Sequence, residues 1–163
     1  MRCLAALLAI AIGLASPAAA GTLDLTREAL VTSGPASGLE AQIRYLTSTW
    51  PAQHIIAVVT TEAAARCDSG SADKVYCTQD VRLAEAILIR WLESDPRAPG
   101  GRFAIHYWYD PTTGAVDIGP GADLLVFLAP THAQRTYTCT VLMRATDAVL
   151  RDVREASRTL EGR

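Results

Sequence analysis

The stretch Asp123–Met143, DLLVFLAPTHAQRTYTCTVLM, decides the fold of this 163-residue chain. Its first part, Leu124–Ala129, is a continuous apolar run of strand-forming residues. Its second part alternates two sets of side chains, Tyr137, Cys139, Val141 and Met143 against Thr138, Thr140, Leu142 and Arg144. Alternation of this kind is typical of a strand. Pro130 opens the polar connection and has no N–H to donate, so we expect the two strands to form an antiparallel hairpin.

Residues 1–20 have the composition of a secretory signal peptide. Arg2 precedes the apolar stretch Leu4–Leu14, and small residues lead up to an expected cleavage after Ala20. That stretch is too short to span a bilayer, and no later segment approaches the roughly 20 apolar residues of a transmembrane helix. We therefore expect residues 21–163 to form one α+β domain, exported to the periplasm, with no direct membrane span.

The charge and the cysteines restrict the partners and the chemistry. The chain has 15 basic residues, of which Arg2 leaves with the leader, and 17 acidic ones, so no nucleic-acid partner is expected. In an oxidising compartment Cys67 and Cys77 are the natural disulfide pair, and closing so short a loop contributes roughly 2–3 kcal/mol. Cys139 is then unpaired. It is either a buried free thiol on a strand or a residue for intermolecular pairing or reaction.

Several elements precede the hairpin. Ser37 and Glu40 fit a capping box, after which apolar residues recur at helical spacing up to Trp50, where Pro51 ends the helix. His54–Thr60 is apolar on both faces, which indicates a strand covered from two sides. Gln79–Ser94 is expected to be an amphipathic helix, because one broad arc holds Val81, Leu83, Ala84, Ile87, Leu88, Trp91 and Leu92.

The remaining elements complete the expected fold. Arg102–Asp110 alternates as a strand, and the turn at Asp110–Gly114 should return it antiparallel as Ala115–Ile118. A helix is expected over Thr146–Leu160, with an apolar stripe toward the sheet. The sequence thus predicts an α+β fold whose antiparallel sheet, a four-strand meander plus one buried strand, packs against two or three helices.

Motifs of known enzymes are missing from the sequence. It contains no G-x-S-x-G, H-E-x-x-H, C-x-x-C or phosphate-binding glycine loop. A Cys139 nucleophile with His106 or His132 is conceivable, as is a zinc site from His54, His106, His132 and a carboxylate, but neither has helpful spacing. We therefore expect a binding protein without a cofactor or metal. The candidate contact residues are Ile89, Trp108 and the arginine row Arg151, Arg154 and Arg158. The row is either a solubilising face or a cationic ridge for an acidic partner.

The order of elements over residues 79–160 resembles that of curli assembly factors of the CsgE family. The shared features are a helix ending in a Trp-containing segment at Trp91, a hairpin with a proline turn at Asp110-Pro111, a strand end Phe127-Leu128-Ala129-Pro130, another strand and a closing helix. The chain differs from the family at Thr112–Gly114 and in its Cys67/Cys77 loop.

The resemblance implies a periplasmic, non-enzymatic accessory factor for secretion of an amyloid subunit. Such factors form homo-oligomeric rings on an outer-membrane secretion channel and guide the unfolded subunit into it. Trp91, Phe127 and Pro130 would carry over as partner-binding residues. Two alternatives remain: an enzyme inhibitor or ligand-binding module that uses the disulfide loop Asp68–Tyr76, and a hydrolase that uses Cys139.

Overall fold

The computed structural model describes residues 29–32, 38–49, 54–71, 73–90, 101–114, 116–131 and 136–161. The expected leader, Ser37, Trp50, Pro51, Trp91 and His132 lie outside these residues. The elements, in chain order, are β1 (Ala29–Thr32), α2 (Leu39–Thr49), β2 (His54–Thr61), β3 (Arg66–Ser71), β4 (Lys74–Arg90), β5 (Arg102–Tyr109), the 3-10 helix η1 (Pro111–Thr113), β6 (Asp123–Pro130), β7 (Thr136–Arg144) and α3 (Asp147–Glu161).

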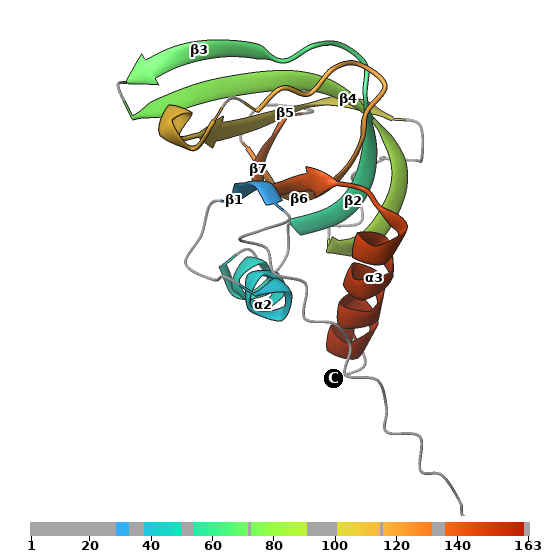
Figure 1. The fold of residues 1–163 in the computed structure, drawn as a ribbon. Coiled ribbons are helices and arrows are strands. Elements are labelled where there is room, and N and C mark those ends of the chain that lie inside the picture. Colours follow the sequence, from blue (N-terminus) through green and yellow to red (C-terminus); the bar gives the residue numbers. More distant parts are fainter. Residues whose placement is uncertain are drawn as a thin grey trace, which may run out of the picture.

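The seven strands form one mixed sheet that closes on itself (Figure 1). The order is β1-β7-β5-β4-β2-β6, and a further pairing of β6 with β7 closes the last five of these strands into a barrel. β1 adds to β7, and β3 adds to β4 outside the barrel. The pair β5–β7 is parallel, whereas the other pairs are antiparallel. The strand connections make this a Greek-key barrel of five strands, an architecture that OB-folds share.

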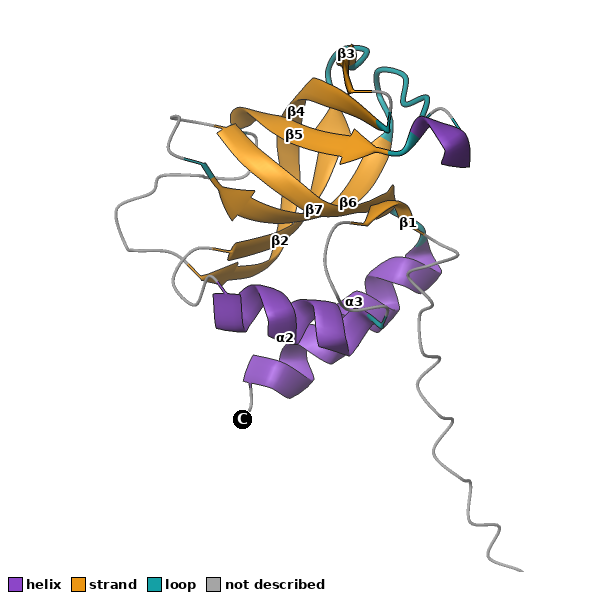
Figure 2. Cartoon of the chain, turned by 90° about the vertical axis from the view of Figure 1, so that its left-hand side faces the viewer, coloured by secondary structure: helices purple, strands orange, loops and turns teal. Residues whose placement is uncertain are grey.

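The barrel has two apolar clusters, one inside and one between its wall and the helices. Figure 2 shows α2 and α3 on the same side of the barrel. Ile55, Ala57 and Val59 of β2 point into the barrel, whereas Ile56 and Val58 of the same strand pack toward the helices. β6 divides its side chains in the same way. These two strands are therefore buried on both faces, which explains their continuous apolar sequences.

The structure confirms the elements with the strongest patterns. The hairpin of β6 and β7, the two-sided strand β2, the strand β5 and the helices α2 and α3 all form. Thr146 caps α3, because its Oγ1 accepts a hydrogen bond from the Val149 N–H. Val149 and Val153 of the predicted apolar stripe are buried against the sheet. The expected disulfide Cys67–Cys77 is also present.

The predicted alternation of β7 holds for only part of the strand. Phe127 pairs with Val141 but Leu128 pairs with Cys139, so Thr140 is an extra residue, a β-bulge. Tyr137 and Cys139 therefore point into the barrel, while Val141 and Met143 point to the helices and Leu142 points inside. The Thr140 hydroxyl donates to the Phe127 carbonyl, which gives that group a partner at the bulge.

The predicted helix Gln79–Ser94 is wrong, because this segment up to Arg90 belongs to the long strand β4. Two bulges explain the error. Opposite the run from Ile56 to Val59 on β2, β4 has the longer run from Leu88 back to Leu83, with register shifts at two points. The extra residues bring apolar side chains to spacings that imitate a helix, whereas the barrel requires a strand between β2 and β5.

The predicted four-strand meander is also wrong. Residues 116–118 form no strand, and Ala115 lies outside the described residues. Ile118 is buried in the apolar cluster inside the barrel. Hydrogen bonds to the Thr61 hydroxyl fix the position of the loop that follows. The Thr61 hydroxyl donates to the Gly119 carbonyl at 2.8 Å and accepts from the Ala122 N–H at 2.9 Å. The chain therefore crosses the barrel, so that β6 pairs with β2 and β7, and β5 pairs with β4 and β7.

Gln79 is the first residue of the predicted helix, and the strand β4 places this polar residue inside the barrel. Its side chain is fully buried. Its Nε2 donates to the carbonyls of Ala63 and Ile118 at 3.0 and 3.2 Å, and the Tyr107 hydroxyl donates to its Oε1 at 3.4 Å. Gln79 thus fastens two irregular segments, 62–65 and 116–119, to the barrel strand β4.

We expect Gln79→Ala to lower the free energy of unfolding by roughly 2–3 kcal/mol, because two carbonyls lose their buried donor. The neighbouring variant Thr78→Ala, whose side chain points outward, should cost less than about 1 kcal/mol. Guanidinium unfolding without reductant measures both. Equal, small losses would contradict the inward position of Gln79.

Candidate functional site

β3, β4 and β5 extend beyond the closed barrel as a three-stranded arm (Figure 1). All six residues of β3 are exposed, so this strand adds no buried side chain to the core. The disulfide joins Cys67 of β3 to Cys77 of β4 at directly opposite positions. The Cys67/Cys77 segment is thus a β-hairpin held by a covalent bond across its two strands.

The outward side chains of the arm form one polar and aromatic surface, which we call the arm face. Its members are Arg66, Asp68, Tyr76, Thr78, Asp80, His106 and Trp108. In the register of the strands Tyr76 lies opposite Trp108, and Thr78 lies opposite His106. These side chains point the same way because successive residues of a strand alternate between its faces.

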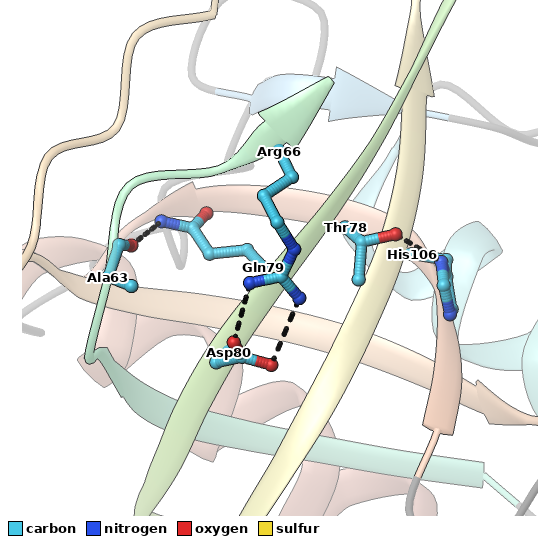
Figure 3. A network of polar contacts seen from close by, with 6 residues as sticks. All are labelled: Ala63, Arg66, Thr78, Gln79, Asp80 and His106. Carbon is cyan, nitrogen blue, oxygen red and sulfur yellow. Dashed lines mark hydrogen bonds and ion pairs between the residues drawn. The ribbon is translucent and has the colours of Figure 1, made fainter. Parts of the chain in front are cut away.

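Polar contacts order the arm face near the barrel (Figure 3). Arg66 Nη1 lies 2.8 Å from Asp80 Oδ2, and Thr78 Oγ1 lies 2.8 Å from His106 Nδ1. The hydrogen bond from Arg66 holds the pKa of the Asp80 carboxyl below its ordinary value. Both partners are well exposed, so the pair contributes little to stability. Its effect is to fix the positions of the two charges on the surface.

Aromatic side chains occupy the outer part of the arm face. Lys74 Nζ lies 4.6 Å from the ring centroid of the half-buried Trp108, a cation–π contact. Tyr76 is 49% exposed, although it is large and partly apolar. A Cβ atom at Gly70 would lie 2.5 Å from the Tyr76 Cδ2, so the ring covers Gly70 across the hairpin. This surface can contact a partner through aromatic rings and hydroxyl groups.

Thr78 and His106 have the contact distance of a nucleophile and its base, but not the surroundings. An activated hydroxyl needs a base oriented by a third group and donors for the developing oxyanion. The pair lies on the open surface of a sheet, and the backbone N–H groups nearby belong to strand pairings. The arrangement is better suited to non-covalent contact than to acyl transfer.

Cys139 is a core residue of the barrel. Its side chain is buried, and its thiol donates to the Val141 carbonyl at 3.0 Å. Burial raises the pKa of Cys139 from its ordinary 9.0 to about 12, which opposes formation of the reactive thiolate. His106 cannot serve as its base, because Cys139 points into the barrel while His106 is exposed on the outer surface. Of the two readings left open by the sequence, the structure supports a buried free thiol.

Two of the sequence-predicted contact residues have different surroundings in the structure. Trp108 belongs to the arm face. Phe127 is fully buried beneath the helices, so it belongs to the core and cannot contact a partner in this fold. Pro130 is the last residue of β6 and lies opposite Tyr137 of β7. Ile89 is in β4 and pairs with Ile55 of β2. The side chains of Pro130 and Ile89, and the whole of Trp91, are outside the described part of the chain.

One residue of the predicted arginine row connects two elements of the fold, and the other two are exposed. Arg154 donates to both carboxylate oxygens of Glu85, with Nε–Oε1 at 3.1 Å and Nη2–Oε2 at 2.6 Å, which ties α3 to β4. Arg151 pairs with its neighbour Asp152, and Arg158 donates to the Arg154 carbonyl. Arg151 and Arg158 are exposed. Only these two remain as cationic contact residues.

Sequence reasoning missed most of the arm face, although a signal was present. The residues Cys77–Leu83 alternate strictly between buried and outward positions, but the inward Gln79 hid the alternation because it is polar. Had β4 been recognised as a strand, the Cys67–Cys77 pair would have set its register with β3 and placed Arg66 and Asp68 opposite Thr78 and Tyr76.

Within the described residues no three His, Cys, Asp or Glu side chains gather as metal ligands, and His132 of the suggested zinc set lies outside them. The same part of the chain has no helix long and apolar enough to cross a membrane.

No protein-family model matches the chain, and no curated protein is found to be similar to it.

We expect Cys139 to resist alkylation by iodoacetamide in the folded protein and to react at the rate of a free thiol in guanidinium, as followed by mass spectrometry. The pKa raised by folding also means that this thiol adds stability below pH 9, which is lost as the pH rises toward 12. Rapid labelling of Cys139 in the folded protein at neutral pH would contradict its burial.

Proposed function

We propose that this chain is a periplasmic, non-enzymatic accessory factor of a curli-type secretion system. It would bind, as a homo-oligomer, to the outer-membrane secretion channel and engage the unfolded amyloid subunit. The support is the arrangement of residues 123–161. Strand β6 with its Phe127–Pro130 end, strand β7 and the closing helix α3 follow each other as in the family that the sequence resembles.

The surfaces of the molecule suit this role. An accessory factor needs one surface for the channel and another for the subunit, because both must be bound at once. The arm and the helices α2 and α3 lie on opposite sides of the barrel (Figure 1). Capture of an extended chain uses strand edges and aromatic side chains, which the arm offers, and requires no catalytic group.

Two parts of the resemblance give no support. One is the helix that ends at Trp91, because residues 79–90 belong to β4 and Trp91 is outside the described residues. The other is the hairpin at Asp110-Pro111, because residues 116–118 form no strand. The proposal therefore depends on the C-terminal unit alone. We assign channel binding to the outer side of α3, where Arg151 and Arg158 are exposed and Arg154 is already neutralised by Glu85.

The test combines oligomeric state with channel binding. Light scattering after size exclusion should show a homo-oligomer at micromolar concentration, and a purified curli-type channel in detergent should bind the protein. The double variant Arg151→Gln/Arg158→Gln should weaken channel binding, most strongly at low salt. The matched control Arg66→Gln/Arg102→Gln removes two exposed charges from the barrel and arm and should bind normally. A monomer without channel binding would refute the proposal.

A second candidate function has one observation in its favour. The disulfide-closed hairpin projects with β3 fully exposed, as expected of an enzyme inhibitor or ligand-binding module that inserts this loop into a target. Replacing residues 68–76 and the disulfide by a short turn should then abolish binding to a periplasmic enzyme while binding to the channel persists. If the variant keeps both interactions, this second role is ruled out.

A further inference from the structure

β3 is an open edge of the sheet. Within the described part of the chain it pairs with β4 on one side and has no strand on the other. Figure 1 shows it along the outer margin of the arm, with β4 between it and β5. Strands of the closed barrel have neighbours on both sides. An open edge presents unpaired N–H and C=O groups, to which a further strand can add.

The disulfide identifies the groups that face this edge. The Cα atoms of Cys67 and Cys77 are 4.1 Å apart, the short spacing of an antiparallel pair that shares no backbone hydrogen bonds. The N–H and C=O of Cys67 therefore point away from β4. Ser69, two residues further on and paired with Val75, points the same way. Asp68, between them, directs its backbone groups to Tyr76 of β4.

Three contacts hold the edge in an extended conformation before any partner arrives. Arg66 binds Asp80 at the first residue of β3, the disulfide joins the second residue, Cys67, to β4, and Tyr76 covers Gly70 near the other end. A strand that is already ordered loses less conformational entropy on binding. The arm is thus preorganised to accept a strand.

The composition of β3 determines which kind of strand fits. Lysine and proline, two of the usual protections of an edge, do not occur in its sequence RCDSGS, and a register shift against β4 is confined to the step between Ser69 and Ser71. Its two charges have opposite sign, and Arg66 is neutralised by Asp80. The other side chains are small and mostly hydroxyl groups. A strand of many charged residues would find only Asp68 as a charge to pair with on β3, and an apolar strand would find little apolar area to bury.

We propose that an extended segment rich in neutral polar residues, supplied by the unfolded secreted subunit, adds to β3 through the backbone groups of Cys67 and Ser69. This inference rests on the proposed function for the identity of the partner. It assigns the subunit to the arm and leaves the channel to α3.

The test uses the oxidised protein and a blocked synthetic peptide of Ser, Thr, Asn and Gln residues. Amide hydrogen exchange, followed by NMR, should be fast at Cys67 and Ser69 in the free protein and slow with peptide, while Asp68 is protected in both. Ser69→Pro removes the outward N–H, which makes no hydrogen bond within the hairpin, so the hairpin keeps its own bonds. The variant should bind the peptide about tenfold more weakly. Ser69→Ala keeps the N–H and should bind like the wild type.

The outcomes separate this inference from the proposed function. Unchanged exchange at Cys67 and Ser69 on peptide binding, or full affinity of Ser69→Pro, would overturn the assignment to β3 even if channel binding is retained. Protection of these amides without peptide, rising with protein concentration, would make a second copy of the chain the occupant instead. If the wild type binds neither peptide nor channel, both proposals fail. The thermal midpoint of Ser69→Pro verifies that the variant is folded.

Discussion

The double pairing of β7 is the constraint on which the rest of the structure depends. One edge of this strand pairs with β6, and the other pairs first with β5 and then with β1. Without these pairings β6 would be an exposed apolar edge, and the sheet could not close. Closure gives the backbone groups of the barrel strands partners and encloses a core that includes the edge-to-face pair of Phe103 and Tyr137.

Bulges allow the same strands to serve two cores. A regular strand sends alternate residues to one face along its whole length, whereas β7 and β4 must cover the barrel interior at one end and the helices at the other. The extra residue at Thr140 turns the apolar side chains of β7 from one cluster to the other. Each of the two register shifts of β4 against β2 reverses the alternation, so the second shift restores it beyond Ile87. The helices can therefore pack on a wall that remains continuous with the barrel.

Closure also separates the stable part of the molecule from the part available for binding. Buried polar side chains such as Gln79 and Thr61 hold irregular segments against the barrel. The arm extends beyond this closed region. Its inner face adds Cys77 and Tyr107 to the barrel cluster, whereas β3 is held by the disulfide and surface contacts. A rigid but uncovered strand is a suitable place for a partner, because binding there does not disturb the packed interior.

The sequence by itself determined the elements whose patterns are local. The apolar run of β6, the two-sided strand β2, the alternation of β5, the amphipathic helices and the nearest cysteine pair were all predictable, because each depends on neighbouring residues. Tertiary structure decided the remainder. Bulges gave the apolar residues of β4 the spacing of a helix. The fold buries the side chains of Gln79 and Phe127. Closure of the barrel pairs β5 with β7 in parallel, where the sequence predicted an antiparallel meander. These outcomes depend on which strands lie side by side, and the pairing of distant strands leaves no periodic mark in either of them.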